Sequence, residues 1–251
     1  MWWVPLRTAR LVAHILRGNH ITQRQNKRDP ARQAELVRAW HEKVLWILNI
    51  EIHVRGSLPE NAPQLWVSNH ISWLDIPLLG SLAPHAVFVS KQEVRSWPVI
   101  GNLAAAAGTL FMQRGSGSEG ARPAIAEGLL SGRHIVIFPE GTTTDGHKVK
   151  RFHARLFQTA IDCRASVRPI AIRYRLPDGR LARSAAYIDN DHILGSIGRI
   201  LATRRLIAEV YLLETIDTHE PTTRNQLAEL AQQRISQAIH PSIKRQTDTN
   251  P

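Results

Sequence analysis

The sequence contains a single cysteine, Cys163, so an internal disulfide and a metal site built from several thiolates are both excluded. The 12 histidines are scattered, without the close spacing to a second His or a carboxylate that zinc sites favour. No run of 18 apolar residues is present, so the sequence predicts no membrane-spanning helix. The first seven residues lack the order of a signal peptide, because the positive charges lie inside the apolar stretch and do not precede it.

Acidic residues are also scarce. The chain has 32 Lys and Arg against 21 Asp and Glu, which gives a net charge of +11 and a pI near 10.7. This balance indicates a polyanionic partner, either nucleic acid, an anionic lipid surface or a phosphate-bearing substrate. With 251 residues, 43% of them apolar, the chain is long enough for one globular domain with a substantial core.

Residues 6–17 have the spacing of an amphipathic helix. Basic residues recur on one side and apolar residues on the other, with tryptophans at the start: Arg7, Arg10, His14 and Arg17 against Val4, Leu11, Val12, Ile15 and Leu16, with Trp2 and Trp3. This pattern is typical of a helix in the membrane interface, and Trp2, Trp3, Arg7, Arg10 and Arg17 are its expected membrane-binding residues. A helix packed on the domain, with a solvated basic face, is the alternative.

A second helix is expected to begin at Asp29-Pro30 and to carry a row of apolar residues at helical spacing. These residues either pack in the core or face a membrane. From about residue 50, short β-branched runs alternate with helical stretches, which predicts one α/β domain with a mixed sheet flanked by helices. The expected strands are 50–54, 65–68, 86–90, 109–112, 134–138, 167–174, 185–188 and 208–213, and the expected helices 73–81, 119–131, 152–163, 192–204 and 222–239. We therefore divide the chain into a helical membrane-associating segment (1–48), an α/β domain (49–243, motif core 64–175) and a frayed tail (244–251).

The stretch from Leu65 to Asp75 is the most informative. A short buried strand ends in Ser68 and Asn69, His70 follows, and Asp75 falls in the first turn of a helix for which Ser72 is a plausible N-cap. A histidine can take a proton from an attacking hydroxyl, and a carboxylate on its other ring nitrogen fixes the tautomer. We therefore predict His70 and Asp75 as catalytic residues, provided that a turn brings them together.

Further polar clusters also follow predicted strands. Lys91 and Arg114 each end a strand, and either cation could bind a phosphate. Glu140, Gly141 and Thr142 follow the strand that ends near Phe138, and Gly141 would let backbone N–H groups approach an anion. Because ligands bind at the carboxyl ends of strands in open α/β sheets, we expect these residues to converge on one cleft.

These motifs, in their order, resemble those of the glycerolipid acyltransferase family. Asn69-His70-Ile71-Ser72-Trp73-Leu74-Asp75 matches its His-x4-Asp motif, and the segments 108–114, 138–142 and 167–170 are similar to its second, third and fourth motifs. The resemblance covers roughly residues 50–215. The nearest groups are bacterial 1-acyl-sn-glycerol-3-phosphate acyltransferases and lyso-ornithine lipid acyltransferases.

The resemblance implies transfer of a fatty acyl group from acyl carrier protein or coenzyme A to the hydroxyl of a lysolipid, in phospholipid synthesis. His70 would be the general base and Asp75 its orienting group, the hydroxyl would attack the thioester directly, and no metal or other cofactor would be needed. Lys91, Arg114, Glu140, Gly141 and Thr142 would bind the acceptor. The implied location is peripheral or monotopic, on the cytoplasmic face of the bacterial inner membrane.

The expected acceptor is 1-acyl-sn-glycerol-3-phosphate, with lyso-ornithine lipid as the alternative. The lysophosphatidate enzymes usually carry Arg after Glu-Gly-Thr, whereas this chain has Thr143, and Asp145-Gly146 resembles the lyso-ornithine branch. Lys148, Lys150 or Arg151 could compensate for the missing phosphate contact.

Two other classes of function compete with this interpretation. A non-enzymatic binder of anionic membrane or nucleic acid would explain the charge, but the basic residues do not interleave with aromatics as in a nucleic-acid module. No nucleic acid partner is therefore expected. A hydrolase using Ser68 or Ser72 with His70 would lack the Gly-x-Ser-x-Gly elbow.

Overall fold

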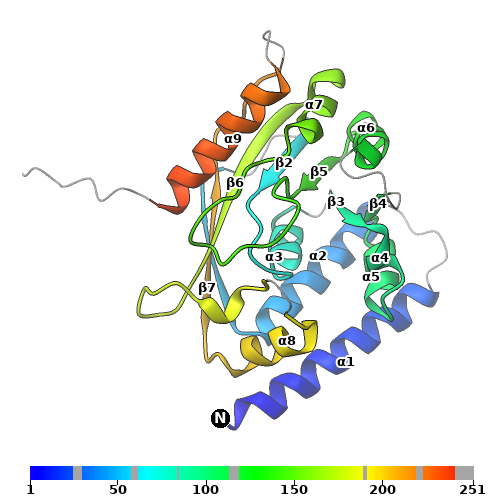
Figure 1. Ribbon diagram of the computed structural model, residues 1–251. Coiled ribbons are helices and arrows are strands. Elements are labelled where there is room, and N and C mark those ends of the chain that lie inside the picture. Colours follow the sequence, from blue (N-terminus) through cyan, green and yellow to red (C-terminus); the bar gives the residue numbers. More distant parts are fainter. Residues whose placement is uncertain are drawn as a thin grey trace, which may run out of the picture.

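The computed structural model describes residues 1–24, 30–57, 62–83, 85–112, 119–188, 191–218 and 223–240. These residues form a seven-stranded sheet in the order β1-β7-β6-β2-β5-β3-β4 (Figure 1). The strands are β1 (Ile50–Arg55), β2 (Gln64–Ser68), β3 (Ala86–Lys91), β4 (Leu110–Met112), β5 (His134–Ile137), β6 (Ser166–Arg175) and β7 (Leu206–Leu212). All neighbours are parallel except β6 and β7, so the sheet is mixed, as predicted.

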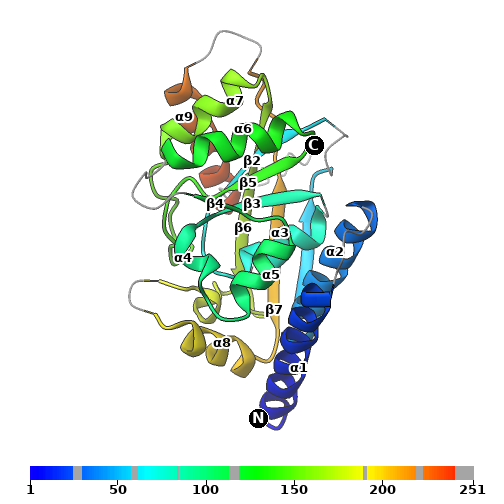
Figure 2. The same cartoon turned by 90° about the vertical axis from the view of Figure 1, so that its right-hand side faces the viewer.

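One face of the sheet is covered by α1 (Trp3–Arg24), α2 (Pro30–Ile47), α3 (Asp75–Leu82) and α8 (Ile193–Ala202). Leu48, Trp66, Ile172 and Ile200 are buried in this layer. Figures 1 and 2 both place α1 alongside α2, with α8 near its amino-terminal half. Alternate residues of β6 project into this layer because side chains of a strand alternate between faces.

The other face is covered by α6 (Arg122–Leu130), α7 (Gln158–Asp162) and α9 (Arg224–Ile239), preceded by the short 3-10 turns η1 (Glu119–Ala121) and η2 (Ala154–Phe157). Its core contains Leu65, Ile135 and Phe157. Gly132 follows the C-cap residue of α6 with φ of +81°, a left-handed conformation that favours glycine and ends the helix. The short helices α4 (Gln92–Arg95) and α5 (Ile100–Ala106) lie between β3 and β4 in the chain and were not predicted.

The predicted strand at 185–188 is wrong. Residues Arg183–Ala185 form the 3-10 turn η3, because Arg183 and Ala185 bond backward to Leu181 and Ala182. The chain then runs past the His70 loop without joining the sheet, and Tyr187 donates to the Ile71 carbonyl at 2.9 Å. A β-branched composition is not enough where no strand edge is available for pairing.

Helix α1 packs part of its predicted apolar side on the domain. Leu11 is buried, Val4 and Ile15 pack on the core, and Arg7 donates to the carbonyls of Thr203 and Arg204 at 2.8 Å at the end of α8. Trp2, Leu6, Val12 and Leu16 are 78, 43, 50 and 57% exposed, and Arg10 and Arg17 are exposed as well. The domain therefore buries the side of α1 that contains Leu11, and the other apolar side chains of the helix stay exposed to solvent.

Helix α2 begins at Pro30 as expected, while Asp29 lies outside the described residues. Its stripe is mainly core, since Val44 and Leu48 are buried, although Leu36 is 38% exposed. None of the helices in the described ranges is sufficiently long and apolar to cross a bilayer.

Candidate active site

The structure joins His70 and Asp75 directly, as the sequence predicted. The loop that leaves β2 turns back before α3, so that Nδ1 of His70 lies 2.7 Å from Oδ2 of Asp75. A carboxylate only accepts, so Nδ1 carries the proton and Nε2 of the neutral ring is left as the acceptor. The His70 side chain is 20% exposed and that of Asp75 fully buried, so the base faces outward from a buried partner.

Asp75 is held by donors on both oxygens. Besides the His70 ring, Oδ2 accepts from the backbone N–H groups of Ile71 and Ser72 at 2.8 and 3.0 Å. Oδ1 accepts from the Tyr174 hydroxyl at 2.8 Å. The expected N-cap at Ser72 is wrong: α3 begins only at Asp75, after Leu74, and the Asp75 N–H bonds to the Ser72 carbonyl at 3.1 Å and not to its hydroxyl. The carboxylate thus accepts four hydrogen bonds.

The His70 ring is fixed from its face as well as from its edge. It stacks on Phe138, with ring centroids 4.0 Å apart and an angle of 13° between the planes. Phe138 directly follows β5, which is the neighbour of β2 in the sheet. Two adjacent strand ends thus supply the base and the surface on which it rests.

Glu140 contacts the same loop through the backbone. Its Oε1 accepts from the His70 N–H and its Oε2 from the Lys150 N–H, both at 2.7 Å. The residue is only 4% exposed, and burial raises the pKa of Glu140 against the opposing effect of these two bonds. Both oxygens thus accept N–H groups within the protein, and the headgroup contact predicted for Glu140 stays a prediction.

The residues after Glu140 differ in their contacts, and of these only Thr144 bonds to the His70 loop. Gly141 has φ of +69°, and its N–H bonds to the Phe138 carbonyl at 3.1 Å, so this N–H is not free for an anion. Thr142 is exposed. Thr143 donates through its hydroxyl to the Tyr187 carbonyl, and Thr144 donates through its N–H to the His70 carbonyl at 2.8 Å.

The predicted cations are placed less closely. Lys91 is exposed at the end of β3, where it precedes α4 as the N-cap residue. Arg114 lies outside the described residues. Sequence reasoning also missed Asn69, Phe138 and Tyr174 as parts of the site. A tyrosine in the apolar alternation of strand β6 was the available signal for Tyr174, since a buried hydroxyl needs a partner.

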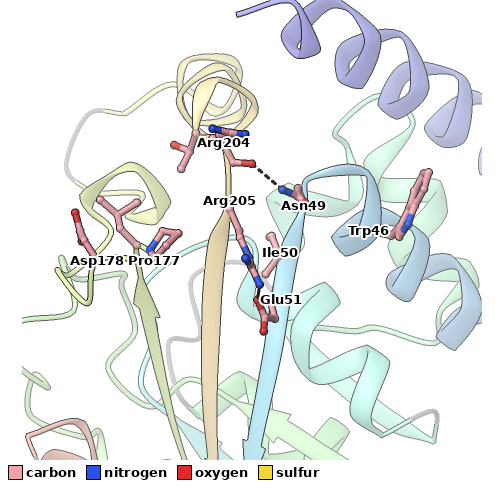
Figure 3. Close-up of a pocket in the computed structure, with 10 residues that line it drawn as sticks. Trp46, Asn49, Ile50, Glu51, Pro177, Asp178, Arg204 and Arg205 are labelled. Carbon is pink, nitrogen blue, oxygen red and sulfur yellow. Dashed lines mark hydrogen bonds and ion pairs between the residues drawn. The ribbon is translucent and has the colours of Figure 1, made fainter.

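An open cavity of about 870 Å³ lies at the same end of the sheet, toward the β1 edge (Figure 3). Trp46, Glu51, Arg204 and Arg205 are among its lining residues, and Arg205 pairs with Glu51 in its wall. It contains none of the motif residues. The cavity and the His70 site therefore share no residue.

Comparisons with known proteins show the family of the chain. The acyltransferase family model matches residues 49–173. A lyso-ornithine lipid O-acyltransferase of Pseudomonas aeruginosa is 42% identical over 243 residues, covering 93% of this chain and 92% of that protein. A 1-acyl-sn-glycerol-3-phosphate acyltransferase of Neisseria meningitidis is 33% identical over 199 residues, covering 78% of this chain and 77% of that protein.

The fold also has a solved counterpart. The crystal structure of the 1-acyl-sn-glycerophosphate acyltransferase from Thermotoga maritima aligns with a TM-score of 0.67 at 18% identity, over 94% of this chain and 97% of that one. The chain belongs to the acyltransferase family, and its relatives are lysolipid acyltransferases.

Proposed function

We propose that this protein transfers a fatty acyl group from a thioester to the free hydroxyl of a lysolipid, with His70 as general base. The observation that carries the proposal is the 2.7 Å contact between Nδ1 of His70 and Oδ2 of Asp75, because a carboxylate can only accept there and Nε2 is left as the proton acceptor. A general base of this kind contributes roughly 10²- to 10⁴-fold to the rate.

The reaction needs no acyl-enzyme. Nε2 of His70 takes the proton of the acceptor hydroxyl as its oxygen attacks the thioester carbonyl carbon. The tetrahedral intermediate then expels the thiolate, which takes the proton from the imidazolium and leaves as a thiol. Asp75 keeps its charge throughout and stabilises the imidazolium between the two proton transfers. Acyl carrier protein and coenzyme A are the candidate donors.

Lyso-ornithine lipid is the acceptor we place first, and 1-acyl-sn-glycerol-3-phosphate the second. Thr143 stands where the lysophosphatidate enzymes usually carry Arg, and its hydroxyl is used on the Tyr187 carbonyl. Asp145, next to Thr144, carries an exposed carboxylate suited to an amine. The greater identity to the Pseudomonas aeruginosa enzyme supports the same order.

The second acceptor is also supported by specific residues. The segment from His147 to Arg151 places exposed Lys148, Lys150 and Arg151 after the third motif, and Lys150 is tied to Glu140 by its backbone. Lys91 adds a further exposed cation at a strand end. Such side chains could bind a phosphate in place of the missing Arg.

The outer face of α1 and the end of α2 are proposed to bind an anionic membrane. Trp46 is 58% exposed, with Lys43 and Arg10 over its ring at 3.7 and 5.5 Å. Exposed aromatics, apolar side chains and adjacent cations suit the interface between acyl chains and anionic headgroups. Of the residues predicted for this role, Trp2 and Arg10 fit, whereas Arg7 fastens α1 to α8. The location proposed is peripheral, on the cytoplasmic face of the inner membrane.

The reaction is tested with purified protein in detergent. Lyso-ornithine lipid and lysophosphatidate are offered separately, each with acyl carrier protein and coenzyme A thioesters, and His70→Ala serves as the control. We expect product from lyso-ornithine lipid and its loss in the variant, which should retain the circular dichroism of the wild type. Retained turnover in His70→Ala would refute the general-base role, and product from lysophosphatidate alone would reverse the acceptor order.

Membrane binding is tested by flotation with vesicles. We expect binding to vesicles that contain an anionic phospholipid, weaker binding to zwitterionic ones, and a loss of binding in Leu16→Glu. Leu130→Glu, on the exposed surface of α6, is the matched control. Equal losses in both variants would show that α1 is not the contact.

A further inference from the structure

Strand β6 continues beyond the point where its neighbour β2 ends. The last register pair joins Ser68 to Ile170, yet β6 extends to Arg175. The chain after Ser68 forms the loop that carries His70. The last residues of β6 on this side therefore lie beside a loop, and two of them bind it through hydrogen bonds.

The first contact is made by the side-chain amide of Asn69, which pairs with the backbone of Ile172 in the way that a neighbouring strand would. The Asn69 amide nitrogen donates to the Ile172 carbonyl at 2.9 Å, and its amide oxygen accepts from the Ile172 N–H at 2.8 Å. Asn69 is 2% exposed. The amide thus replaces a backbone partner of β6 and fixes where the loop begins, directly before the catalytic base.

The second bond lies two residues further along the same face of β6. Tyr174 is 1% exposed, and its hydroxyl donates to Oδ1 of Asp75 at 2.8 Å. Burial, together with the charge of Asp75, raises the pKa of Tyr174, so the hydroxyl keeps its proton and acts as a donor.

Among the residues that the structure describes, only Tyr174 donates to Oδ1, whereas the three donors to Oδ2 all come from residues 70–72. Asp75 is fully buried, so solvent does not replace a missing donor. Without the hydroxyl, the carboxylate would be free to rotate Oδ1 toward another donor and to draw Oδ2 away from the imidazole.

We propose that Tyr174 is a positioning residue of the transfer reaction. Its hydroxyl holds Oδ1 of Asp75, so that Oδ2 stays directed at Nδ1 of His70 and Nε2 stays directed at the acceptor. The kinetic consequence rests on the proposed acyl transfer, whereas the geometry of the dyad is measurable without substrate. Because Tyr174 contacts Asp75 and not the reacting atoms, its removal should affect kcat more than KM.

Tyr174→Phe removes the hydroxyl and keeps the ring. Tyr211→Phe is the matched control, because Tyr211 lies on β7 and its hydroxyl contacts Glu209 at 3.4 Å, outside the site. For each variant we would measure the Tm, kcat, KM for both substrates, and the proton resonance of the His70 Nδ1–H, assigned by its absence in His70→Ala.

We expect Tyr174→Phe to fold, with kcat lower by about tenfold, in the range for a lost hydrogen bond to a charged group, and KM unchanged. Its Nδ1–H resonance should move or broaden, while Tyr211→Phe matches the wild type. Wild-type kcat with an unmoved resonance would overturn the proposal, as would a raised KM at unchanged kcat. Failure of Tyr174→Phe to fold, with Asp75→Asn still folded, would mark the bond as structural only and also overturn it.

The experiment separates this inference from the proposed reaction. If the wild-type protein transferred no acyl group to either acceptor, a moved resonance in Tyr174→Phe would still support the role of Tyr174 in orienting the dyad. If transfer occurred and the resonance stayed in place, the reaction would stand and the positioning role would fail.

Discussion

The carboxylate of Glu140 and the backbone N–H of His70 lie 2.7 Å apart, across 70 residues of sequence. The other Glu140 oxygen holds the Lys150 N–H, so one buried side chain fastens the catalytic loop to the loop after β5. Glu140 thus fixes the backbone of the His70 loop, while the substrate contact expected from its motif stays a prediction.

Replacing Glu140 by Gln is predicted to lower kcat by at least tenfold and to destabilise the fold by about 1–3 kcal/mol, because one of its two backbone donors would then face an amide N–H group. Steady-state kinetics and thermal unfolding measure the two effects. Glu127→Gln, at an exposed position of α6, is the control. An unchanged kcat with a raised KM for the acceptor would instead restore Glu140 as a headgroup contact.

Replacing Thr143 by Arg is predicted to shift the ratio of kcat/KM toward lysophosphatidate by about tenfold, since a charge-assisted contact with the phosphate would supply roughly 1.4 kcal/mol. The measurement compares both acceptors under identical detergent conditions. Thr143→Gln adds length without charge and should leave the ratio near that of the wild type. An equal shift in both variants would assign the effect to the lost bond with Tyr187.

His41 makes the fold sensitive to acid. Burial lowers the pKa of His41 from its ordinary 6.5 to about 4, against the opposing effect of the Gly80 backbone. Because the folded-state pKa lies below the unfolded one, the unfolded chain binds this proton first. The stability contributed by neutral His41 is therefore full above about pH 6.5 and is lost as the pH falls toward 4, by about 3 kcal/mol.

His41→Met is predicted to remove this part of the acid sensitivity, which urea unfolding at pH 7 and pH 4.5 would show as a smaller difference between the two midpoints. His85→Met, at an exposed turn position, should keep the wild-type difference. The same difference in all three proteins would mean that other groups govern the loss of stability.

Gly80 allows α2 and α3 to pack closely, because a Cβ at this position would lie 2.1 Å from Nδ1 of His41. Gly80→Ala is predicted to destabilise the protein by about 1–3 kcal/mol, through overpacking of a buried contact. Gly198→Ala, in α8 where a Cβ meets open space, should stabilise it by roughly 0.5–1 kcal/mol. Thermal unfolding compares the two, and equal Tm values would contradict the close packing.

The sequence by itself determined the alternation of strands and helices and the position of the His70–Asp75 pair. Strands such as β2 and β5 form from short apolar runs, and α2 begins at a proline, so their signals are local. His70 and Asp75 are only five positions apart, and a single turn suffices to bring them into contact. The strand expected at 185–188 failed because pairing depends on a neighbour elsewhere in the chain.

Only the tertiary structure decided what surrounds the pair. Tyr174 reaches Asp75 across 99 residues and Glu140 reaches His70 across 70, because parallel pairing aligns β6, β2 and β5 in one register. The tertiary structure also decided that Arg7 binds the end of α8 while Leu16 remains exposed. The reason is that the domain buries only the side of α1 that contains Leu11. The spacing of residues within one helix defines its faces, but the packing of the whole chain selects which of them is buried.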